Sequence, residues 1–142
     1  MTDAIVVGGH LRLRPFNTKD TYPEQNLSND LCQGVVAGNT VYLRGQVAQD
    51  LETRESVAVG DAAAQTHKTV DNIEILLAEA GAAPEHIVTA TVYLTDVRYR
   101  EDVYRVLGER LQGVYYASTG VVVAALARPE WVVEVTVTAV LP

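Results

Sequence analysis

The sequence predicts an α+β fold in which a mixed β-sheet carries two helices on one face. Three observations favour this class: short apolar runs with a period of two residues, two longer segments with helical periodicity, and the order in which they alternate. After residue 30 this order reads strand, strand, helix, strand, helix, strand, strand. The chain has 142 residues, a length that suits one domain with a single core. We therefore expect one domain over residues 1–142, with a hairpin and an arm over 1–30 and the core over 31–142.

The first thirty residues predict the hairpin and the arm. The stretch IVVGGHLRLR contains two short apolar runs around Gly8-Gly9, a pair that favours a tight hairpin turn. The next stretch, PFNTKDTYPEQNLSND, is polar and rich in turn-forming residues. Such a composition indicates an ordered loop or arm.

The stretch GVVAGNTVYLRGQVAQD predicts two strands joined by a turn at Gly38-Asn39. Side chains of a strand alternate between the two faces of its sheet. The second of these strands therefore presents two sets of side chains to opposite faces, namely Val41, Leu43 and Gly45 against Tyr42, Arg44 and Gln46.

Two segments predict helices. Residues 60–81 carry Asp61, a good capping residue, near their start and end at Gly81, where a helix-terminating glycine is expected. Helical spacing brings four side chains of this segment to one face: Thr66, Val70, Ile73 and Leu77. Residues 98–113 form the second predicted helix, with Val103, Val106, Leu107 and Leu111 on one side.

Three strands complete the predicted sheet. Residues 85–96 alternate, with Val88, Ala90, Val92 and Leu94 opposed to Ile87, Thr89, Thr91 and Tyr93. Residues 118–127 and 131–141 predict two apolar strands, joined by a short turn at 128–130 and hence antiparallel. The helix between the strand at Val41 and the strand at Ile87 is a crossover, so these two strands are expected to be parallel.

The last two strands are too apolar to leave one face of the sheet in water. The stretch GVVVAALA carries no polar residue on either side of its pleat. Large exposed apolar surfaces are typically covered in a functional assembly. We therefore expect copies of the chain to associate through the face that the helices leave open.

Charge and composition exclude several classes of function. The net charge of −7 argues against nucleic-acid binding and against a ribonuclease, because phosphates are bound by clustered Lys and Arg. No apolar run approaches the ~20 residues of a membrane span, and the start of the chain does not resemble a signal peptide. The lone Cys32 cannot form an internal disulfide, and the three histidines lack metal-ligand spacing. We expect a cytoplasmic protein without a membrane partner or a metal site.

One carboxylate interrupts the last strand. In WVVEVTVTAV, Trp131, Val133, Val135, Val137 and Ala139 share one face, so Glu134 lies on the other face beside threonines. If a second copy covers that face, desolvation raises the pKa of Glu134 and suits it to act as a general acid or base near neutral pH. The alternative is a carboxylate that pairs with an arginine or is solvated at a sheet edge.

Several stretches, in this order, resemble the RidA/YjgF family: VVAGNTVYLRGQVAQD, HKTVDNIEILLAEAGA, IVTATVYLTDV and ALARPEWVVEVTVTAV. The similarity covers roughly residues 31–142. It implies a chorismate-mutase-like fold, a homotrimer and three ligand sites in the clefts between subunits. It also implies hydrolysis of reactive enamines and imines to 2-keto acids and ammonia, without a metal or organic cofactor.

The resemblance assigns site residues position by position. Glu134 matches the family's glutamate, which positions or activates water, and Gly45 matches the glycine whose backbone lines the pocket. Ser118 stands where the family has a carboxylate-binding arginine, and Leu31 stands at the position of its binding tyrosine. Tyr104 replaces a frequent asparagine, and Gly120 replaces a frequent cysteine.

The missing arginine implies an altered substrate class or a substitute cation, because a serine hydroxyl carries no charge. Arg44 is the leading substitute. The alternative is that Arg44 is an outward-facing strand residue or a partner for an acid elsewhere. Arg14 and the N-terminal arm are further candidates. The triplet Ser118, Thr119 and Gly120 either binds an anion or simply turns the chain, and Tyr104 either reaches the ligand or packs at a contact. The leading hypothesis is an imine or enamine deaminase, and the alternative is a non-catalytic, metabolite-binding or regulatory trimer on the same scaffold.

Overall fold

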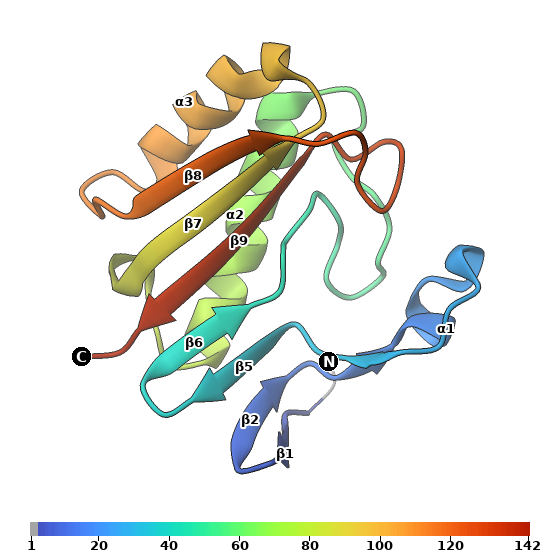
Figure 1. Cartoon of the computed structure of the whole chain (residues 1–142), viewed down its shortest axis with the longest axis vertical. Helices are drawn as coiled ribbons and strands as arrows, with labels where there is room; N and C mark the ends of the chain where they lie inside the picture. The colour runs from blue at the N-terminus through green and yellow to red at the C-terminus, as the bar shows by residue number, and fades with distance from the viewer. Residues whose placement is uncertain (1–2) are drawn as a thin grey trace.

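The computed structural model describes residues 3–142 and places seven strands of this range in one mixed sheet (Figure 1). Their order is β1-β2-β5-β6-β9-β7-β8. Two long helices, α2 (Ala62–Glu79) and α3 (Arg100–Arg110), lie on one face of this sheet. The strands are β1 (Ile5–Val7), β2 (His10–Leu13), β5 (Gly34–Ala37), β6 (Thr40–Leu43), β7 (Ile87–Leu94), β8 (Ala117–Val122) and β9 (Val133–Val140). The predicted α+β class and the predicted order of elements are confirmed.

The N-terminal hairpin extends the main sheet, because β2 pairs with β5 in antiparallel fashion. Gly8 and Gly9 have φ values of 61° and 81°, the left-handed backbone that a two-residue hairpin turn requires. The arm that follows is ordered and forms a second, two-stranded sheet. Its elements are β3 (Phe16–Asn17), α1 (Thr18–Thr21), a 3₁₀ turn at Pro23–Gln25 and β4 (Asp30–Leu31). The first two residues of the predicted N-terminal segment lie outside the described residues.

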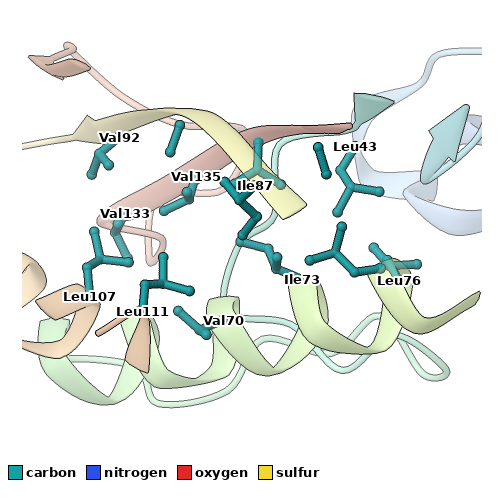
Figure 2. Close-up of a cluster of buried hydrophobic side chains, with 14 of the residues drawn as sticks. Leu43, Val70, Ile73, Leu76, Ile87, Val92, Leu107, Leu111, Val133 and Val135 are labelled. Atoms are coloured by element: carbon teal, nitrogen blue, oxygen red, sulfur yellow. The ribbon is translucent and has the colours of Figure 1, made fainter. Parts of the chain in front are cut away.

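The main core lies between the sheet and the two helices (Figure 2). The helical face predicted for α2 is buried: Val70 and Leu77 are 0% exposed and Ile73 is 2% exposed. The inward set of β9 is also buried, as alternation predicts, with Val133, Val135, Val137 and Ala139. Both predicted ends of α2 are confirmed, since the Asp61 side chain accepts a hydrogen bond from the Ala64 amide at 2.9 Å and Gly81 has a φ of 79°.

A smaller cluster holds the arm against the body of the protein. Its buried members include Tyr22 and Trp131, each 3% exposed. The Arg128 guanidinium lies 5.1 Å from the Tyr22 ring centroid and 4.8 Å from that of Trp131. Arg128 also donates to the Arg54 carbonyl at 2.7 Å. Cation–π contacts of this kind attach the arm to the loop that leads into β9.

The predicted antiparallel hairpin of the last two strands is wrong. β8 pairs with β7 in parallel register, and β9 lies between β6 and β7, antiparallel to both. The turn at 128–130 belongs to a longer loop, which the contacts of Arg128 hold away from β8. β9 takes a central place because its inward side chains are apolar throughout. The strands at Val41 and Ile87 are parallel as predicted, but β9 separates them.

The alternation predicted for β7 fails at its first residues. A register shift lies between Ile87 and Thr89, so Ile87 is 3% exposed while Val88 is 44% exposed. A β-bulge of this kind adds one unpaired residue and reverses the faces before it. From Ala90 onward the predicted alternation holds, and Ala90, Val92 and Leu94 are buried.

Replacing Gly108 with alanine is expected to raise the free energy of unfolding by about 0.5–1 kcal/mol, because glycine is a poor helix former. Gly108 lies inside α3 and has open space where a Cβ would stand. Urea unfolding followed by circular dichroism measures the change. Gly113→Ala is the matched control, since Gly113 also has open space but a φ of 81°. This control is expected to destabilise the protein, and a destabilised Gly108→Ala would contradict the prediction.

Candidate active site

The face of the sheet opposite the helices carries a row of polar side chains around Glu134. Tyr93, Thr91 and Thr89 of β7 are register partners of Glu134, Thr136 and Thr138 of β9. Directly paired residues project to the same face, and the odd-numbered residues of β9 face the helices. Glu134 therefore lies on the open face, as predicted, in a central strand rather than at a sheet edge.

Gly45 brings the backbone after β6 against the Glu134 carboxylate. A Cβ at this position would overlap Oε2 of Glu134 and lie 2.7 Å from its Cδ. The bridge between Gln46 and Val135, with backbone bonds of 2.9 and 3.0 Å, fixes this approach. The alternation predicted for this strand ends at Leu43, because Gln46 is buried and pairs with the inward-facing Val135, while Gly45 faces the Glu134 carboxylate. The physical basis of this close contact is the absence of a side chain at Gly45.

Burial raises the pKa of the half-buried Glu134, and the positive charge of Arg44 opposes this effect. Within residues 3–142 no hydrogen-bond donor or ion-pair partner is found for its carboxylate. The alternative reading of an arginine-paired acid is therefore not realised within one chain. A half-desolvated carboxylate with unoccupied oxygens can accept a proton from a bound water.

Arg44 lies on the same side of the sheet, over the aromatic residues of the arm. Its guanidinium is 5.2 Å from the Phe16 ring centroid and 5.8 Å from that of Tyr22. Arg44 and Leu31 also line one groove of about 860 Å³, which lies between the N-terminal hairpin and the arm. We call this cavity the hairpin groove; the rest of its lining is Ile5, Val7, Arg12, Pro15, Phe16, Asp30 and Cys32. Glu134, Gly45 and Arg44 thus form one group, and Leu31 is linked to it only through the groove that it shares with Arg44.

The remaining predicted residues form a second group on β8 and α3. Ser118 and Gly120 are paired with the buried Ala90 and Val92 and therefore face the helices. The Tyr104 hydroxyl lies 3.4 Å from Ser118 Oγ. A Cβ on Gly120 would collide with that hydroxyl, so glycine here makes room for Tyr104. Thr119 pairs with Thr91 and lies on the open face, so the predicted triplet is a strand and not a turn.

The two groups do not meet within one chain, because the sheet separates Ser118, Gly120 and Tyr104 from Glu134. Every residue of β8 is exposed, and β8 is an edge strand. An exposed edge is a surface on which another chain can pair or pack. The arrangement brings the two groups together only if a second copy supplies one of them.

Arg100 is a cation that sequence reasoning missed. Its guanidinium lies 4.4 Å from the Tyr104 ring centroid, and its Nη1 would be 2.7 Å from a Cβ at Gly120. Its neighbours Arg98 and Arg105 are bound to Asp96 and Asp102 at 2.7 and 3.0 Å. Arg100 has no carboxylate within 4.0 Å in the described part of the chain. The spacing of four residues between Arg100 and Tyr104 is the signal that could have identified this pair.

No group of three or more His, Cys, Asp or Glu side chains within residues 3–142 could hold a metal ion. The described helices also include none with the length and apolar character that a membrane crossing requires. Cys32 is half-buried, and its thiol donates a hydrogen bond to the Gly34 carbonyl at 3.3 Å.

Comparisons with known proteins extend over most of the chain. A family model described as Endoribonuclease L-PSP matches residues 23–141. A RutC family protein of Pyrococcus abyssi is 42% identical over 65 residues, and protein DfrA of Myxococcus xanthus is 36% identical over 94 residues. These matches cover 46% and 66% of this chain, and 50% and 71% of the two relatives. The match with the Pyrococcus abyssi protein thus spans half of that protein's length. The crystal structure of RidA from the Antarctic bacterium Psychrobacter sp. is 33% identical, with a TM-score of 0.72 over 78% of this chain and 87% of that one.

Proposed function

Because the chain belongs to the YjgF/RidA family, which the Endoribonuclease L-PSP model describes, we propose that it hydrolyses a reactive imine or enamine to a carbonyl compound and ammonia. The observation that carries this proposal is the Glu134 carboxylate, half-buried against Gly45 and without an ion-pair partner in residues 3–142. The substrate class differs from that of family members with an arginine at the position of Ser118. The reaction uses no metal or organic cofactor, and the compartment is the cytoplasm.

The chemistry requires a water and one proton acceptor. A water bound to Glu134 gives a proton to the carboxylate as its oxygen bonds to the imine carbon, and the imine nitrogen takes a proton. That proton comes from the protonated Glu134 carboxyl, which is thereby returned to its ionised form. In the resulting carbinolamine, Glu134 accepts the hydroxyl proton and passes it to the amino nitrogen as the C–N bond breaks, so that the products are a carbonyl compound and NH3. A carboxylate with a raised pKa suits both directions of this transfer, because it exchanges protons closer to neutral pH.

The proposal includes a homotrimer, in which each site joins residues of two copies. One copy contributes Glu134, Gly45 and Arg44, and its neighbour contributes Ser118 and Tyr104 of the exposed β8 edge and α3. This division is supported by the position of the two groups on opposite faces of one sheet. Arg100, held over Tyr104, is then a second candidate beside Arg44 for the cation that binds an anionic substrate group.

An imine-trapping assay tests the proposal. An amino-acid oxidase generates a 2-imino acid in situ, semicarbazide traps the unhydrolysed fraction, and the rate of semicarbazone formation is followed with increasing protein. We expect the protein to lower that rate in proportion to its concentration, and Glu134→Ala to remove the effect. If no imine is hydrolysed faster than in buffer, the proposal fails.

The replacement of the family arginine by Ser118 favours a second candidate, a non-catalytic trimer that binds a small metabolite on the same scaffold. Saturable binding of a metabolite without accelerated hydrolysis of any imine would support this candidate. A ribonuclease is disfavoured by the net charge of −7.

Replacing Arg44 with glutamine is expected to move the acidic limb of the pH–rate profile to higher pH. Hydrolysis needs ionised Glu134, so the rate falls as the pH drops through its pKa in the folded protein. Arg44 lowers that pKa, and removing the charge therefore raises it further. The measurement is kcat/KM between about pH 4 and pH 9.

Arg44→Lys is the matched control, because it retains the charge and should leave the limb in place. A limb that stays unchanged or moves to lower pH in Arg44→Gln would contradict the electrostatic coupling of Arg44 to Glu134.

A further inference from the structure

A guanidinium and two hydroxyl groups converge beside the edge strand β8. The Tyr104 hydroxyl lies 3.4 Å from Ser118 Oγ, and the Arg100 guanidinium lies 4.4 Å from the centroid of the Tyr104 ring. A Cβ on Gly120 would collide with the Tyr104 hydroxyl and lie 2.7 Å from Nη1 of Arg100. These polar atoms therefore border the same space, which stays open because residue 120 has no side chain.

Arg100 is a cation whose planar group is held while its N–H groups stay free. Stacking on an aromatic ring orients a guanidinium and leaves its edge, where the donors lie, open to a ligand. Arg100 is exposed, and no carboxylate lies within 4.0 Å of it among residues 3–142. Its neighbours Arg98, Arg105 and Arg110 are each bound by an aspartate of the same chain. Arg100 is therefore the arginine of this segment that is available to an anion.

The position of Arg44 suits it less well to contact a ligand at the site. Its guanidinium lies over the arm, at 5.2 and 5.8 Å from the ring centroids of Phe16 and Tyr22. It lines the hairpin groove, which Glu134 does not line. Arg44 therefore acts on Glu134 through its charge, whereas Arg100 is placed to contact the ligand.

We propose, building on the function and the assembly proposed above, that Arg100 binds a carboxylate of the substrate, with the hydroxyls of Tyr104 and Ser118 as further donors. A carboxylate presents two oxygens in one plane to the edge of a guanidinium, and hydroxyl groups can donate to its remaining lone pairs. The cation comes from the first residue of α3 instead of the strand position that Ser118 occupies. Its single charge matches one carboxylate better than a doubly charged phosphate. The ligand is therefore an imine or enamine with a carboxylate at this point.

Calorimetry with a stable analogue of the product tests the proposal without turnover. Pyruvate carries the carboxylate of a 2-keto acid, and pyruvamide has a neutral amide in its place. We expect the protein to bind pyruvate more tightly than pyruvamide, and Arg100→Gln to weaken pyruvate binding alone by about 10- to 100-fold, the effect of losing a charge-assisted pair. Equal affinities of the wild type for the two compounds would overturn the proposal, and so would unchanged pyruvate binding in Arg100→Gln.

Arg105→Gln is the matched control, because Arg105 is an exposed arginine of the same helix that Asp102 already binds at 3.0 Å. It should leave both affinities unchanged. Loss of pyruvate binding in Arg44→Gln but not in Arg100→Gln would assign the carboxylate to Arg44 and overturn the proposal. An Arg100→Gln protein that loses pyruvate and pyruvamide equally, or that dissociates in light scattering, would show that Arg100 joins subunits and does not bind the ligand.

The imine-trapping assay separates failure of this inference from failure of the proposed function. For the imine of alanine, we expect Arg100→Gln to raise KM by about 10- to 100-fold and to leave kcat nearly unchanged, because the carboxylate does not react and is bound equally in the ground state and the transition state. Hydrolysis with an unaltered KM in Arg100→Gln would overturn the carboxylate site and leave the proposed function intact. Pyruvate binding that depends on Arg100, without hydrolysis of any imine, would support the carboxylate site and overturn the proposed function.

Discussion

Glu134→Gln is expected to lower kcat/KM for imine hydrolysis by about 10²- to 10⁴-fold, the usual contribution of a general base. Glutamine keeps the size of the side chain and removes its capacity to accept a proton. Stability should not fall, because the carboxylate is half-buried, makes no ion pair within residues 3–142, and has a pKa raised by burial. The imine-trapping assay and urea unfolding measure the two quantities.

Glu85→Gln is a matched control for this change. Glu85 is exposed in the 3₁₀ turn Pro84–His86 before β7, so its replacement should leave kcat/KM unchanged. If Glu134→Gln retains wild-type activity, water is not activated by this carboxylate, and the non-catalytic alternative gains support.

Gly45→Ala is expected to lower kcat by about 10- to 100-fold, because a displacement of roughly 1 Å at a reacting group has effects of this size. The added methyl group would occupy the position of the Glu134 carboxylate and push it away. The contacting atoms belong to the end of a flexible side chain, so Glu134 can move and the fold can persist. We therefore expect activity to fall while the urea midpoint stays close to that of the wild type.

Gly108→Ala serves as the control for activity, since a methyl group there meets no neighbouring atom. A Gly45→Ala protein with full activity would show that the close approach of the backbone does not hold Glu134 in its working position. A Gly45→Ala protein that fails to fold would show that the Glu134 side chain cannot move aside. In that case Gly45→Ser is made in a Glu134→Ala background, and restored stability would identify the contact with Glu134 as the cause.

Local patterns predicted most of the elements. The helical spacing of Val70, Ile73 and Leu77 identified the buried face of α2, and alternation placed Glu134 on the open face of β9. These signals are short-range, because each depends on residues within a few positions of one another. The faces of β9 and α2 could therefore be derived without knowledge of their neighbours.

Long-range pairing could not be derived in the same way. The order β6-β9-β7 requires β9 to enter between two strands that come earlier in the chain, and no local pattern encodes this insertion. The bulge at Val88 is likewise a property of the pairing with β9. The hairpin error arose from treating neighbouring segments as neighbouring strands, and the β7 error arose from assuming unbroken alternation.

The resemblance implied ligand sites in clefts between subunits, and one chain places the predicted residues on two faces of its sheet. The resemblance gave the positions Glu134, Gly45 and Ser118 but not the sheet that lies between them. Arg100 escaped notice because its environment, the Tyr104 ring and the gap at Gly120, exists only in the folded protein. Only the folded protein distinguishes Arg100 from Arg98 and Arg105, which are bound by Asp96 and Asp102.

Trp131 gives this protein a built-in optical reporter. It is the one tryptophan of the sequence, it is buried, and it lies between the body and the guanidinium that also covers Tyr22 of the arm. Its emission should be blue-shifted while the arm is docked and should redden if the arm detaches and admits solvent to the indole. Fluorescence spectra can therefore follow the movement of the N-terminal segment without any added label.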